Sequence, residues 1–469
     1  MNVLNKIINN PLLSVGHRLT LDIESTFPNT EALIVGGCVR DLIMDIEPHD
    51  VDIATNADID KIAEHYHSAN IGQSKDFGIV LVLFEGQEFE VAHYREEFGS
   101  EDNRHPDEVV QVNDFASDTA RRDITINSLG IDTSGEVIDH QGGIQDIANG
   151  VIKAVGNPND RFKEDALRII RVARFAARFG FGIHGETIFA MFTNRELTRT
   201  LSVERIRDEM IKAASYGGRV LRSFLKTLDA AQVLDIHLPE INTFHGFKHG
   251  VKYHPEGDLY AHTMAALIVS QSNDPLTNIS ILFHDIGKTV TQAFDEEGKV
   301  SYKGHDSVGA EMFEEIGKRL KFSNDQIEAI QFGIKHHMVA HDFRKMKKSK
   351  IVEFRQSKHF PLLKAVARAD DAARLHLFDE DSFNATMEHV ENVFKVFGEK
   401  KEFEARMTPL INGRMIMNLA EDEGFTIEGK RIGQIKNTVR EIIIEKEFDI
   451  TLQDTSRMVR ELVKVKWEE

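Results

Sequence analysis

The 469-residue sequence has little that would stabilise a secreted protein or anchor a membrane protein. It has a single cysteine, Cys38, which excludes an internal disulfide and any cysteine-rich zinc module. No apolar run approaches the roughly 18 residues that a membrane-spanning helix needs, so we expect no membrane partner. Residues 1–13 carry Asn and Lys among their apolar side chains and lack the apolar core of a secretory signal. These absences favour a reducing, cytoplasmic setting.

Positive charge is also in the minority. Lys and Arg number 57 against 76 Asp and Glu, which gives a net charge of −19. This balance excludes a uniformly basic nucleic-acid coat, so any surface for nucleic acid must be a local patch. A hydrophobic content of 41% with 28% charged residues excludes a mainly disordered or fibrous chain. At about 150 residues per domain, the length predicts about three domains.

The pattern of apolar residues divides the chain into two kinds of structure. Strands are predicted at 32–35, 51–54, 79–84 and 88–92, with a helix at 39–44 after the first strand. Residues 94–118 are polar and aperiodic, which predicts a mobile loop. After about residue 155, helical periodicity dominates. The sequence therefore predicts a small N-terminal α/β domain followed by a long all-α region.

Two glycines and two aspartates lie beside the first predicted strands. Gly36 and Gly37 allow a tight strand-to-helix turn and a close approach of backbone N–H groups to phosphate. Asp50 and Asp52 lie two residues apart in a strand, so their side chains share a face. Such carboxylates suit a Mg²⁺ pair between a triphosphate and an attacking hydroxyl, and Glu90 is a candidate third ligand. Either motif alone is typical of a turn or an exposed strand edge, whereas the two together favour nucleotidyl transfer.

Residues 121–127, RRDITIN, form a second unit. The paired Arg121 and Arg122 suit forked hydrogen bonds to phosphate, and Asn127 suits a ribose hydroxyl. The alternative is a basic helix start with an ordinary cap. Residues 139–143, DHQGG, predict a structural turn that closes the domain.

The segment 161–178 has six basic and two acidic residues, a local charge opposite in sign to that of the whole chain. Its apolar spacing predicts a helix, on which Asp165 and Arg168 share a face. Together they offer an acceptor beside a donor, which matches the edges of cytosine and adenine, whereas uracil and guanine present the opposite polarity. Alone, the pair would be an exposed ion pair worth about 0.2–0.5 kcal/mol.

The segments GGCVRD, DVDIAT, RRDITIN, DHQGG and EDALRIIRVARF stand in an order that resembles the head and neck of class II tRNA nucleotidyltransferases. These are the CCA-adding enzymes, which share their core with bacterial poly(A) polymerases. Residues 201–209, LSVERIRDE, resemble the next motif of the family, and residues 412–413 and 429–433 resemble a stretch of its tail. The resemblance implies an α+β fold, with a small polymerase-beta-like α/β nucleotidyltransferase head followed by all-α segments.

The resemblance also implies roles for particular residues. Asp50 and Asp52 would hold catalytic Mg²⁺, with Glu90 as a further catalytic carboxylate, and Asp165 and Arg168 would read CTP or ATP without a template. Residues 94–118 would correspond to the flexible loop that helps the switch between C and A. The expected nucleotide-binding residues are Gly36, Gly37, Arg40, Arg121, Arg122, Asp123, Asn127, Asp165, Arg168, Arg171 and Arg174.

The helical region has histidines and aspartates that suit a metal. Neutral imidazoles with a carboxylate are good ligands for a divalent transition metal that activates water. The candidates are His262, His284, Asp285, His305, His336, His337, Asp370 and Asp371. With 21 histidines in the chain, any single one is most simply a core or surface residue.

The order His, His-Asp, Asp on predicted helices resembles the HD phosphohydrolase superfamily. This resemblance implies His262, His284, Asp285 and Asp370 as primary ligands of Ni, Mn, Co, Fe or Zn, with Asp371 as a competitor of Asp370. His305, His336 and His337 would join them if the site binds two metal ions. Lys288 would either contact phosphate or interact with the helix dipole.

The predicted organisation has five segments: a leader at 1–30, a head at 31–155, a neck and body at 156–250, an HD domain at 251–375 and a tail at 376–469. The expected function is transfer of CMP and AMP from CTP and ATP to the 3′ end of tRNA, releasing pyrophosphate, together with HD phosphodiesterase or phosphatase activity. The alternatives are a bacterial-type poly(A) polymerase and an HD module that only binds. The basic run 344–350 is equally consistent with an RNA-phosphate patch and with a solvated loop.

Overall fold

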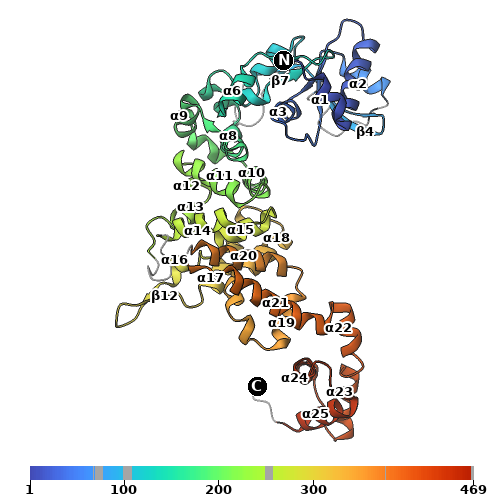
Figure 1. Cartoon of the computed structure of the whole chain (residues 1–469), viewed down its shortest axis with the longest axis vertical. Helices are drawn as coiled ribbons and strands as arrows, with labels where there is room; N and C mark the ends of the chain where they lie inside the picture. The colour runs from blue at the N-terminus through green and yellow to red at the C-terminus, as the bar shows by residue number, and fades with distance from the viewer. Residues whose placement is uncertain (67, 69–77, 99–107, 249–256, 375–376, 466–469) are drawn as a thin grey trace. The chain divides into compact units, whose positions relative to one another are not determined.

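The computed structural model describes residues 1–469 except 67, 69–77, 99–107, 249–256, 375–376 and 466–469 (Figure 1). Contacts group the chain into two compact units. The first contains residues 1–245, 273–275 and 317–322, and the second contains residues 246–272, 276–316 and 323–469. The first unit has the large sheet, and the second is almost entirely helical. The predicted α+β class is confirmed, whereas the division into five segments stays a prediction.

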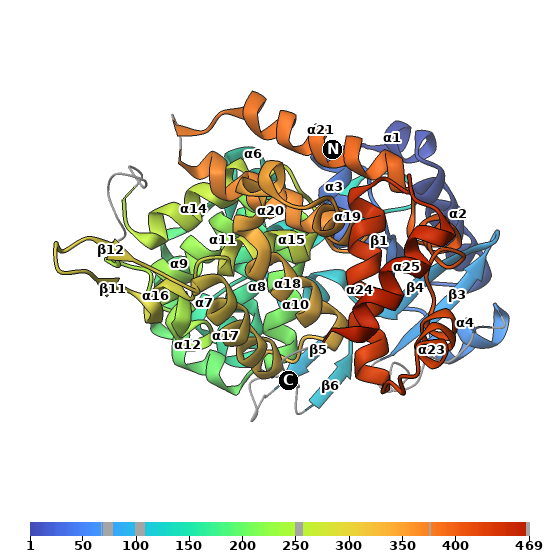
Figure 2. The same ribbon diagram turned by 90° about the horizontal axis from the view of Figure 1, so that it is seen from below.

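The sheet of the first unit has six strands in the order β3-β4-β2-β1-β7-β8. All neighbours are antiparallel except β2 and β4, which run parallel. Strand β1 lies inside the sheet between β2 and β7, and all four of its residues are buried. Figure 2 shows β3 and β4 side by side. The strands are β1 Ala32–Val35, β2 Asp52–Thr55, β3 Ile79–Phe84, β4 Gln87–His93, β7 Leu129–Ile131 and β8 Val137–Asp139.

Helices of the first unit cover the sheet and continue beyond it. In α8, the apolar residues Ile169, Ile170, Ala173 and Ala177 are buried, and Gly180, at φ +67°, ends the helix. The helices are α1 Leu4–Asn9, α2 Pro11–Thr26, α3 Gly37–Ile43, α4 Ile59–His65, α5 Phe115–Ala120, α6 Gly143–Asn149, α7 Pro158–Glu164, α8 Leu167–Phe179, α9 Gly185–Thr193, α10 Val203–Ser215, α11 Gly218–Ala230, α12 Leu234–His237 and α13 Pro239–Asn242. Two short strands, β9 Val151–Ile152 and β10 Gly182–Ile183, pair in parallel.

The first 30 residues pack against the sheet. Helix α2 buries Leu13, Leu19 and Ile23 in the same apolar core as strands β1 and β2. Asn10 caps this helix by accepting a hydrogen bond from the Leu13 N–H at 3.0 Å. These residues therefore form part of the core of the sheet, which the prediction of a leader did not anticipate.

The prediction of a loop over residues 94–118 is wrong for the part of this segment that the structure describes. Strands β5 (Arg95–Phe98) and β6 (Glu108–Gln111) form an antiparallel pair, and α5 follows. The Tyr94 side chain is fully buried, and its hydroxyl donates a hydrogen bond to Glu31 at 2.9 Å. Strands β5 and β6 contain charged residues and lack a regular alternation of apolar residues, so the local sequence does not predict this strand pair. Residues 99–107 of the predicted loop lie outside the described residues.

The second unit is a set of helices with its own apolar cores. Its helices are α14 Leu259–Val269, α15 Pro275–Phe283, α16 Lys288–Thr291, α17 His305–Arg319, α18 Asn324–His336, α19 Lys348–Arg355, α20 Phe360–Ala373, α21 Glu380–Phe397, α22 Lys400–Met407, α23 Gly413–Asp422, α24 Gly429–Glu445 and α25 Leu452–Lys464. Two 3-10 helices, η4 His337–His341 and η5 Phe343–Lys345, connect α18 to α19. A short hairpin joins β11 Ala293–Phe294 and β12 Val300–Ser301.

The basic run 344–350 lies in η5 and the first turn of α19. Lys348 pairs with Glu447 at 2.6 Å, and Lys347 lies 3.4 Å from Glu441 of α24. Lys350 pairs with Glu353 of its own helix at 2.7 Å. Because these ammonium groups are matched by carboxylates, the structure gives little support to an RNA patch built from the three lysines.

Cys38 lies in the first turn of α3 and is buried. Burial, with a further contribution from the charge of Asp52, raises the pKa of its thiol to about 12. Among the described residues, none of the helices combines the length and the apolar content needed to cross a membrane.

Candidate active sites

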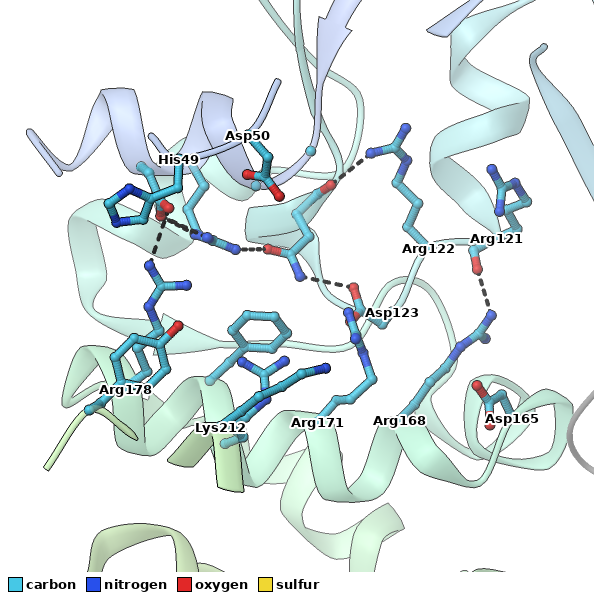
Figure 3. Close-up of a pocket in the computed structure, with 18 residues that line it drawn as sticks. His49, Asp50, Arg121, Arg122, Asp123, Asp165, Arg168, Arg171, Arg178 and Lys212 are labelled. Carbon is cyan, nitrogen blue, oxygen red and sulfur yellow. Dashed lines mark hydrogen bonds and ion pairs between the residues drawn. The ribbon is translucent and has the colours of Figure 1, made fainter. Parts of the chain in front are cut away.

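A cavity of about 580 Å³ lies in the first unit, beside the turn between β1 and α3 (Figure 3). All eleven residues that the sequence predicted to bind nucleotide line it, together with Asp50. Most of the charged lining residues are basic, although the whole chain is acidic. The structure therefore brings four segments that lie far apart in the sequence to one concave surface.

Three carboxylates gather at the sheet next to this cavity. Asp52 begins β2 and stands in register with Glu90 of the parallel strand β4, so the two side chains share a face. Burial, followed by the charges of Asp50 and Glu90, raises the pKa of Asp52 to about 6, while the charge of Arg122 acts in the opposite direction. Like charges that raise the pKa of a buried carboxyl group also create a favourable place for a divalent cation.

The turn at Gly36 needs glycine. Its φ of +81° lies in the left-handed region, and it precedes the first residue of α3. A Cβ there would lie 3.4 Å from a guanidinium nitrogen of Arg122 and 3.9 Å from a carboxylate oxygen of Asp52. The absent side chain thus leaves room between these two groups.

A buried carboxylate orients the two arginines of the RRDITIN segment. Asp118, only 1% exposed, pairs with Arg121 at 2.7 Å and with Arg122 at 2.9 Å. Arg122 also donates a hydrogen bond to the carbonyl oxygen of Asn127 at 3.0 Å. The guanidinium groups are therefore fixed before any ligand binds.

Asp123 is held in its ionised form. Burial alone would raise its pKa, but the charge of Arg171, 2.8 Å away, and hydrogen bonds outweigh burial and lower the pKa to about 2. The Asn127 amide donates one of these hydrogen bonds at 3.1 Å. Asp123 is thus an acceptor at neutral pH, fixed between two residues that line the same cavity.

The structure brings Asp165 and Arg168 to the same cavity, at the side shown on the right of Figure 3. The predicted reason is wrong, because Asp165 is not on the helix: it ends α7 in an extended conformation, before α8 begins. The two side chains are also held by different partners. Asp165 pairs with Arg205 at 3.0 Å, whereas Arg168 pairs with Glu164 at 2.6 Å and donates to the carbonyl oxygen of Arg121 at 2.8 Å.

Two predicted residues, Arg40 and Arg174, line the cavity but are already paired. Arg40 is buried against Asp41 and Asn127, with its guanidinium group 4.8 Å from the centre of the Phe179 ring. Arg174 forms a buried ion pair with Glu209 at 2.5 Å. Because a carboxylate neutralises each of these guanidinium groups, the two arginines form part of the cavity wall and contribute little net charge to it.

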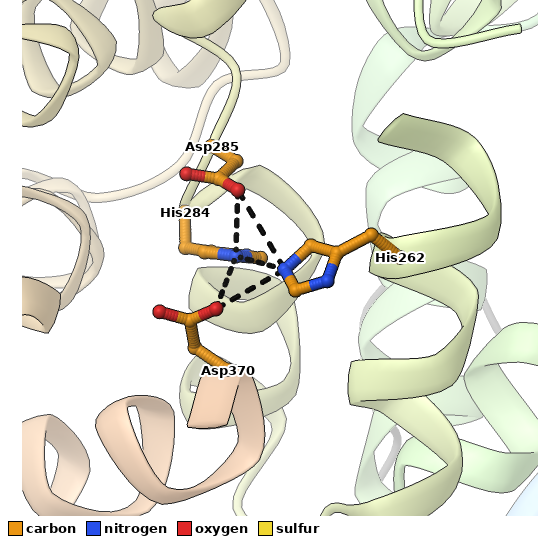
Figure 4. A group of neighbouring side chains, drawn as sticks. All are labelled: His262, His284, Asp285 and Asp370. Atoms are coloured by element: carbon orange, nitrogen blue, oxygen red, sulfur yellow. Dashed lines mark hydrogen bonds and ion pairs between the residues drawn. The ribbon is translucent and has the colours of Figure 1, made fainter. Parts of the chain in front are cut away.

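In the second unit, four buried side chains converge (Figure 4). His262, His284, Asp285 and Asp370 each direct one ligand atom to a common point, with all four atoms within 4.8 Å of one another. The Nε2 atoms of the two histidines lie only 3.2 Å apart, and the Nε2 of His262 lies 3.1 Å from a carboxylate oxygen of Asp370. The Nδ1–H of His284 donates to the carbonyl oxygen of Ile281 at 2.7 Å, so Nε2 is the ring nitrogen that faces Asp285 and Asp370. The two carboxylates outweigh burial and raise the pKa of this imidazole to about 10, and a metal ion would take the place of the proton on Nε2.

A second group shares Asp285. The Oδ1 atom of Asp285 lies 3.4 Å from the Nε2 of His305 and 3.6 Å from the Nε2 of His337. Within the described residues, this buried oxygen has no hydrogen-bond partner. The other carboxylate oxygen, Oδ2, faces His262 and His284 and accepts a 2.6 Å hydrogen bond from Lys288. The two oxygens of one carboxylate therefore face two different sets of histidines.

The structure distinguishes the remaining candidates. Asp370 belongs to the four-residue group, whereas Asp371 pairs with Arg374 and His341 instead. His336 lies outside both groups of the described residues, and its ring packs edge-on against Phe332 and Phe354. His336 is the last residue of α18 and His337 is the first residue of η4, so these neighbours belong to two different helices and face different partners.

Two family profiles match these two regions. The family described as "Poly A polymerase head domain" matches residues 32–153, and the family described as "HD domain" matches residues 253–375. The first region is therefore similar in sequence to poly A polymerase head domains, and the second is similar to HD domains. The resemblance that the motifs predicted is thereby confirmed for both regions.

Curated relatives agree over part of their length. The CCA-adding enzyme of Lactobacillus delbrueckii subsp. bulgaricus is 44% identical over 184 residues, which cover 39% of this chain and 46% of the relative. The CCA-adding enzyme of Enterococcus faecalis is 44% identical over 182 residues, covering 39% of this chain and 45% of the relative. The chain thus spans about half the length of the curated relatives that it matches.

Solved structures show the same fold along nearly the whole chain. The crystal structure of the Bacillus stearothermophilus CCA-adding enzyme in complex with CTP has a TM-score of 0.69 at 19% identity, covering 96% of this chain and 98% of that chain. The Thermotoga maritima CCA-adding enzyme complexed with tRNA has a TM-score of 0.55 at 17% identity, covering 98% and 99% of the two chains.

The head cavity also includes residues that the sequence reasoning missed. Arg178 ends the basic segment 161–178 that the sequence singled out, but it is not among the expected nucleotide-binding residues. Lys212 and Tyr216 come from the end of α10, which no local pattern connects to the head. The remaining missed residues are Asp41, His49 and Phe175.

Proposed function

We propose that the chain is a tRNA nucleotidyltransferase that adds CMP and AMP from CTP and ATP to the 3′ end of tRNA and releases pyrophosphate. The observation that carries this proposal is the gathering of Asp50, Asp52 and Glu90 beside a basic cavity that also holds Asp165 and Arg168. The relatives and solved structures that resemble the chain are CCA-adding enzymes, and this supports the choice of substrate.

The proposed metal site of the head fits Mg²⁺. Carboxylate oxygens are its preferred protein ligands, and Asp52 is a buried carboxyl group whose pKa is raised by two neighbouring carboxylates. Bound there by Asp50 and Asp52, with Glu90 as a further carboxylate, the metal would neutralise the triphosphate and lower the pKa of the attacking ribose hydroxyl.

The side chains of the cavity would position the nucleotide. Arg121 and Arg122, already oriented by Asp118, would donate to phosphate oxygens. Asp123 and Asn127 lie together and are suited to the ribose hydroxyls. Since these groups are fixed in advance, little ordering would be needed when the triphosphate binds.

Base selection would be made by Asp165 and Arg168. A carboxylate accepts the exocyclic amine of cytosine or adenine, and a guanidinium donates to the neighbouring ring nitrogen. Arg205 and the Leu167 N–H each donate to one oxygen of Asp165, and Arg168 donates to Glu164 and to the carbonyl oxygen of Arg121, so both groups are held in place before a base binds. The same pair would therefore accept both CTP and ATP and disfavour UTP and GTP.

The HD domain would act as a metal-dependent phosphohydrolase on a 2′,3′-cyclic or 2′-phosphate. The unpartnered Asp285 Oδ1 between His305 and His337 fits a second ion next to the one that His262, His284, Asp285 and Asp370 would hold. Imidazole with carboxylate suits Ni, Mn, Co, Fe or Zn, and such ions supply an activated water at neutral pH.

The deciding experiment supplies CTP and ATP to a tRNA that lacks its 3′ CCA and sequences the products. We expect addition that stops at CCA. A long A tail would instead support a poly(A) polymerase, the second candidate, which the match to the poly A polymerase head family favours. No addition at all would refute nucleotidyl transfer. We also propose that the protein is cytoplasmic and that the chain divides into the five segments expected from the sequence.

A further inference from the structure

The helical unit contains a cavity of about 380 Å³. Two of its lining residues are close in sequence to the proposed metal ligands. The cavity is lined by residues of η4, η5, α20 and α21. Asp371, in its lining, directly follows Asp370 on α20, and His341 is in the same 3-10 helix as His337. The cavity and the proposed metal centre are therefore built on the same two elements, η4 and α20.

The chemistry of this lining favours a phosphate. Arg344 and Arg374 both contribute guanidinium groups. Arg374 is oriented by Asp371 and by the His341 ring, 3.3 Å away. Arg344 has no carboxylate partner among the described residues, and its one hydrogen bond is a long, exposed one of 3.4 Å to the carbonyl oxygen of Ser382. An exposed arginine of this kind can turn to an anion at little cost.

The acidic groups of the cavity have other partners. The Asp379 carboxylate caps α21 by accepting a hydrogen bond from the Ser382 N–H at 3.1 Å. The Asp371 carboxylate lies between Arg374 and His341. The half-buried ring of Phe378 supplies an apolar wall. The volume lies within the range of small-molecule sites, so a single nucleotide fits.

We propose that this cavity binds the phosphate on the 5′ side of the nucleoside whose 2′- or 3′-phosphate reaches the metal centre. Arg344 would contact that phosphate, while Phe378 would pack against the nucleoside. This inference rests on the HD activity proposed above and narrows its substrate class. The preferred substrate is an RNA end or a nucleotide with a second phosphate, and a nucleoside cyclic phosphate alone is a poorer substrate.

The test compares hydrolysis of three cyclic phosphates by the full chain with Mn²⁺. These are adenosine 2′,3′-cyclic phosphate, the same compound with a 5′-phosphate, and the dinucleotide ApA ending in a 2′,3′-cyclic phosphate. We expect KM to be about tenfold lower for one or both compounds with a second phosphate, which corresponds to about 1.4 kcal/mol. Comparing KM for the dinucleotide with KM for the 5′-phosphorylated compound distinguishes a preference for an RNA phosphodiester from a preference for a free 5′-phosphate.

Arg344→Ala should remove this preference by raising KM for the compounds with a second phosphate about tenfold, while KM for adenosine 2′,3′-cyclic phosphate stays unchanged. Lys345→Ala is the matched control, because Lys345 is exposed on the same 3-10 helix and does not line the cavity. Equal KM values for all three substrates, or equal effects of both variants, would overturn the inference.

If none of the compounds is hydrolysed, the proposed HD activity fails, but the cavity is still tested. Titration of adenosine 3′,5′-bisphosphate and of adenosine 3′-monophosphate into the same three proteins measures binding without turnover. Tighter binding of the bisphosphate that is lost in Arg344→Ala alone would support the cavity. Equal affinities would refute it.

Discussion

Asp118 offers a sharp test of how the head domain orients its arginines. Its Oδ1 atom accepts hydrogen bonds from Arg121 at 2.7 and 3.0 Å, and its Oδ2 atom accepts from Arg122 at 2.9 and 3.2 Å. Each oxygen therefore receives a fork from a different arginine. The carboxylate is buried, whereas the Arg121 and Arg122 side chains are 20% and 15% exposed.

The substitution Asp118→Asn should remove one of the two forks, because an amide keeps only one accepting oxygen. Breaking a buried ion pair by removing one partner costs about 3–5 kcal/mol, and we expect about 2–3 kcal/mol here since water can still reach both arginines. KM for CTP should rise about tenfold, because Arg121 and Arg122 are no longer both held toward the cavity.

The effect should also depend on pH. Burial alone would raise the pKa of Asp118, but the charges of Arg121 and Arg122 outweigh burial and lower it. A carboxyl group with a lowered folded-state pKa stabilises the fold above its unfolded pKa, and this stabilisation is lost as the pH falls through the folded value. The difference in unfolding free energy between wild type and Asp118→Asn should therefore shrink in acid.

Urea unfolding and CTP kinetics would measure these effects, with Asp114→Asn as the control on the same helix. Asp114 caps α5 by accepting from the Ser117 N–H at 2.9 Å, and asparagine caps as well as aspartate does. We expect that variant to stay within about 0.5 kcal/mol of wild type. The reasoning fails if Asp118→Asn is as stable as the control, or if its KM for CTP is unchanged.

Three further predictions concern the two proposed active sites and the acid stability of the head. Asp52→Ala should abolish nucleotide addition to tRNA and spare hydrolysis of a cyclic phosphate, whereas His284→Ala should do the reverse; loss of both activities in one folded variant would contradict separate sites. Asp123, with its pKa lowered to about 2 from 3.8, should stabilise the fold above about pH 4 by about 2.4 kcal/mol and lose this contribution between pH 4 and 2. The free energy of unfolding of wild type and of Asp123→Asn, measured between pH 4 and 2, would test this, because the free energy of the variant should fall less steeply as the pH falls. His305→Ala should lower the bound metal from two ions per chain to one by elemental analysis, while His336→Ala should leave it at two; one ion in wild type would refute the shared Asp285 arrangement.

Local motifs explain why much of the site could be predicted from sequence. Gly36 and Gly37 follow a run of four buried residues, so the turn and the helix after it are determined by neighbours in the chain. Strand alternation predicted that Asp50 and Asp52 share a strand face. That reason is wrong for Asp50, which precedes β2, while Asp52 shares its face with Glu90 through the pairing of β2 and β4. The histidines of the HD region lie in or next to segments with clear helical periodicity, so the sequence could assign them to helices.

Long-range contacts explain what the sequence reasoning missed. The Tyr94 ring is buried in an apolar cluster with Leu33 and Val35, and its hydroxyl donates to Glu31, 63 residues away. The sequence around Tyr94 contains none of these partners. Asp165 leaves the helix and pairs with Arg205, 40 residues away, although its spacing from Arg168 suggested a shared helical face. Tertiary contacts override local periodicity at both positions.

The burial of Cys38 has a practical consequence for experiments in solution. Only the thiolate reacts with maleimide dyes, and this thiol stays protonated and covered at neutral pH. Cysteines introduced at exposed positions of the poly A polymerase head and of the HD domain would therefore take up label selectively in the otherwise wild-type background. A donor and acceptor dye attached in this way would measure whether the distance between the two regions changes when the proposed substrates CTP, ATP and tRNA are added.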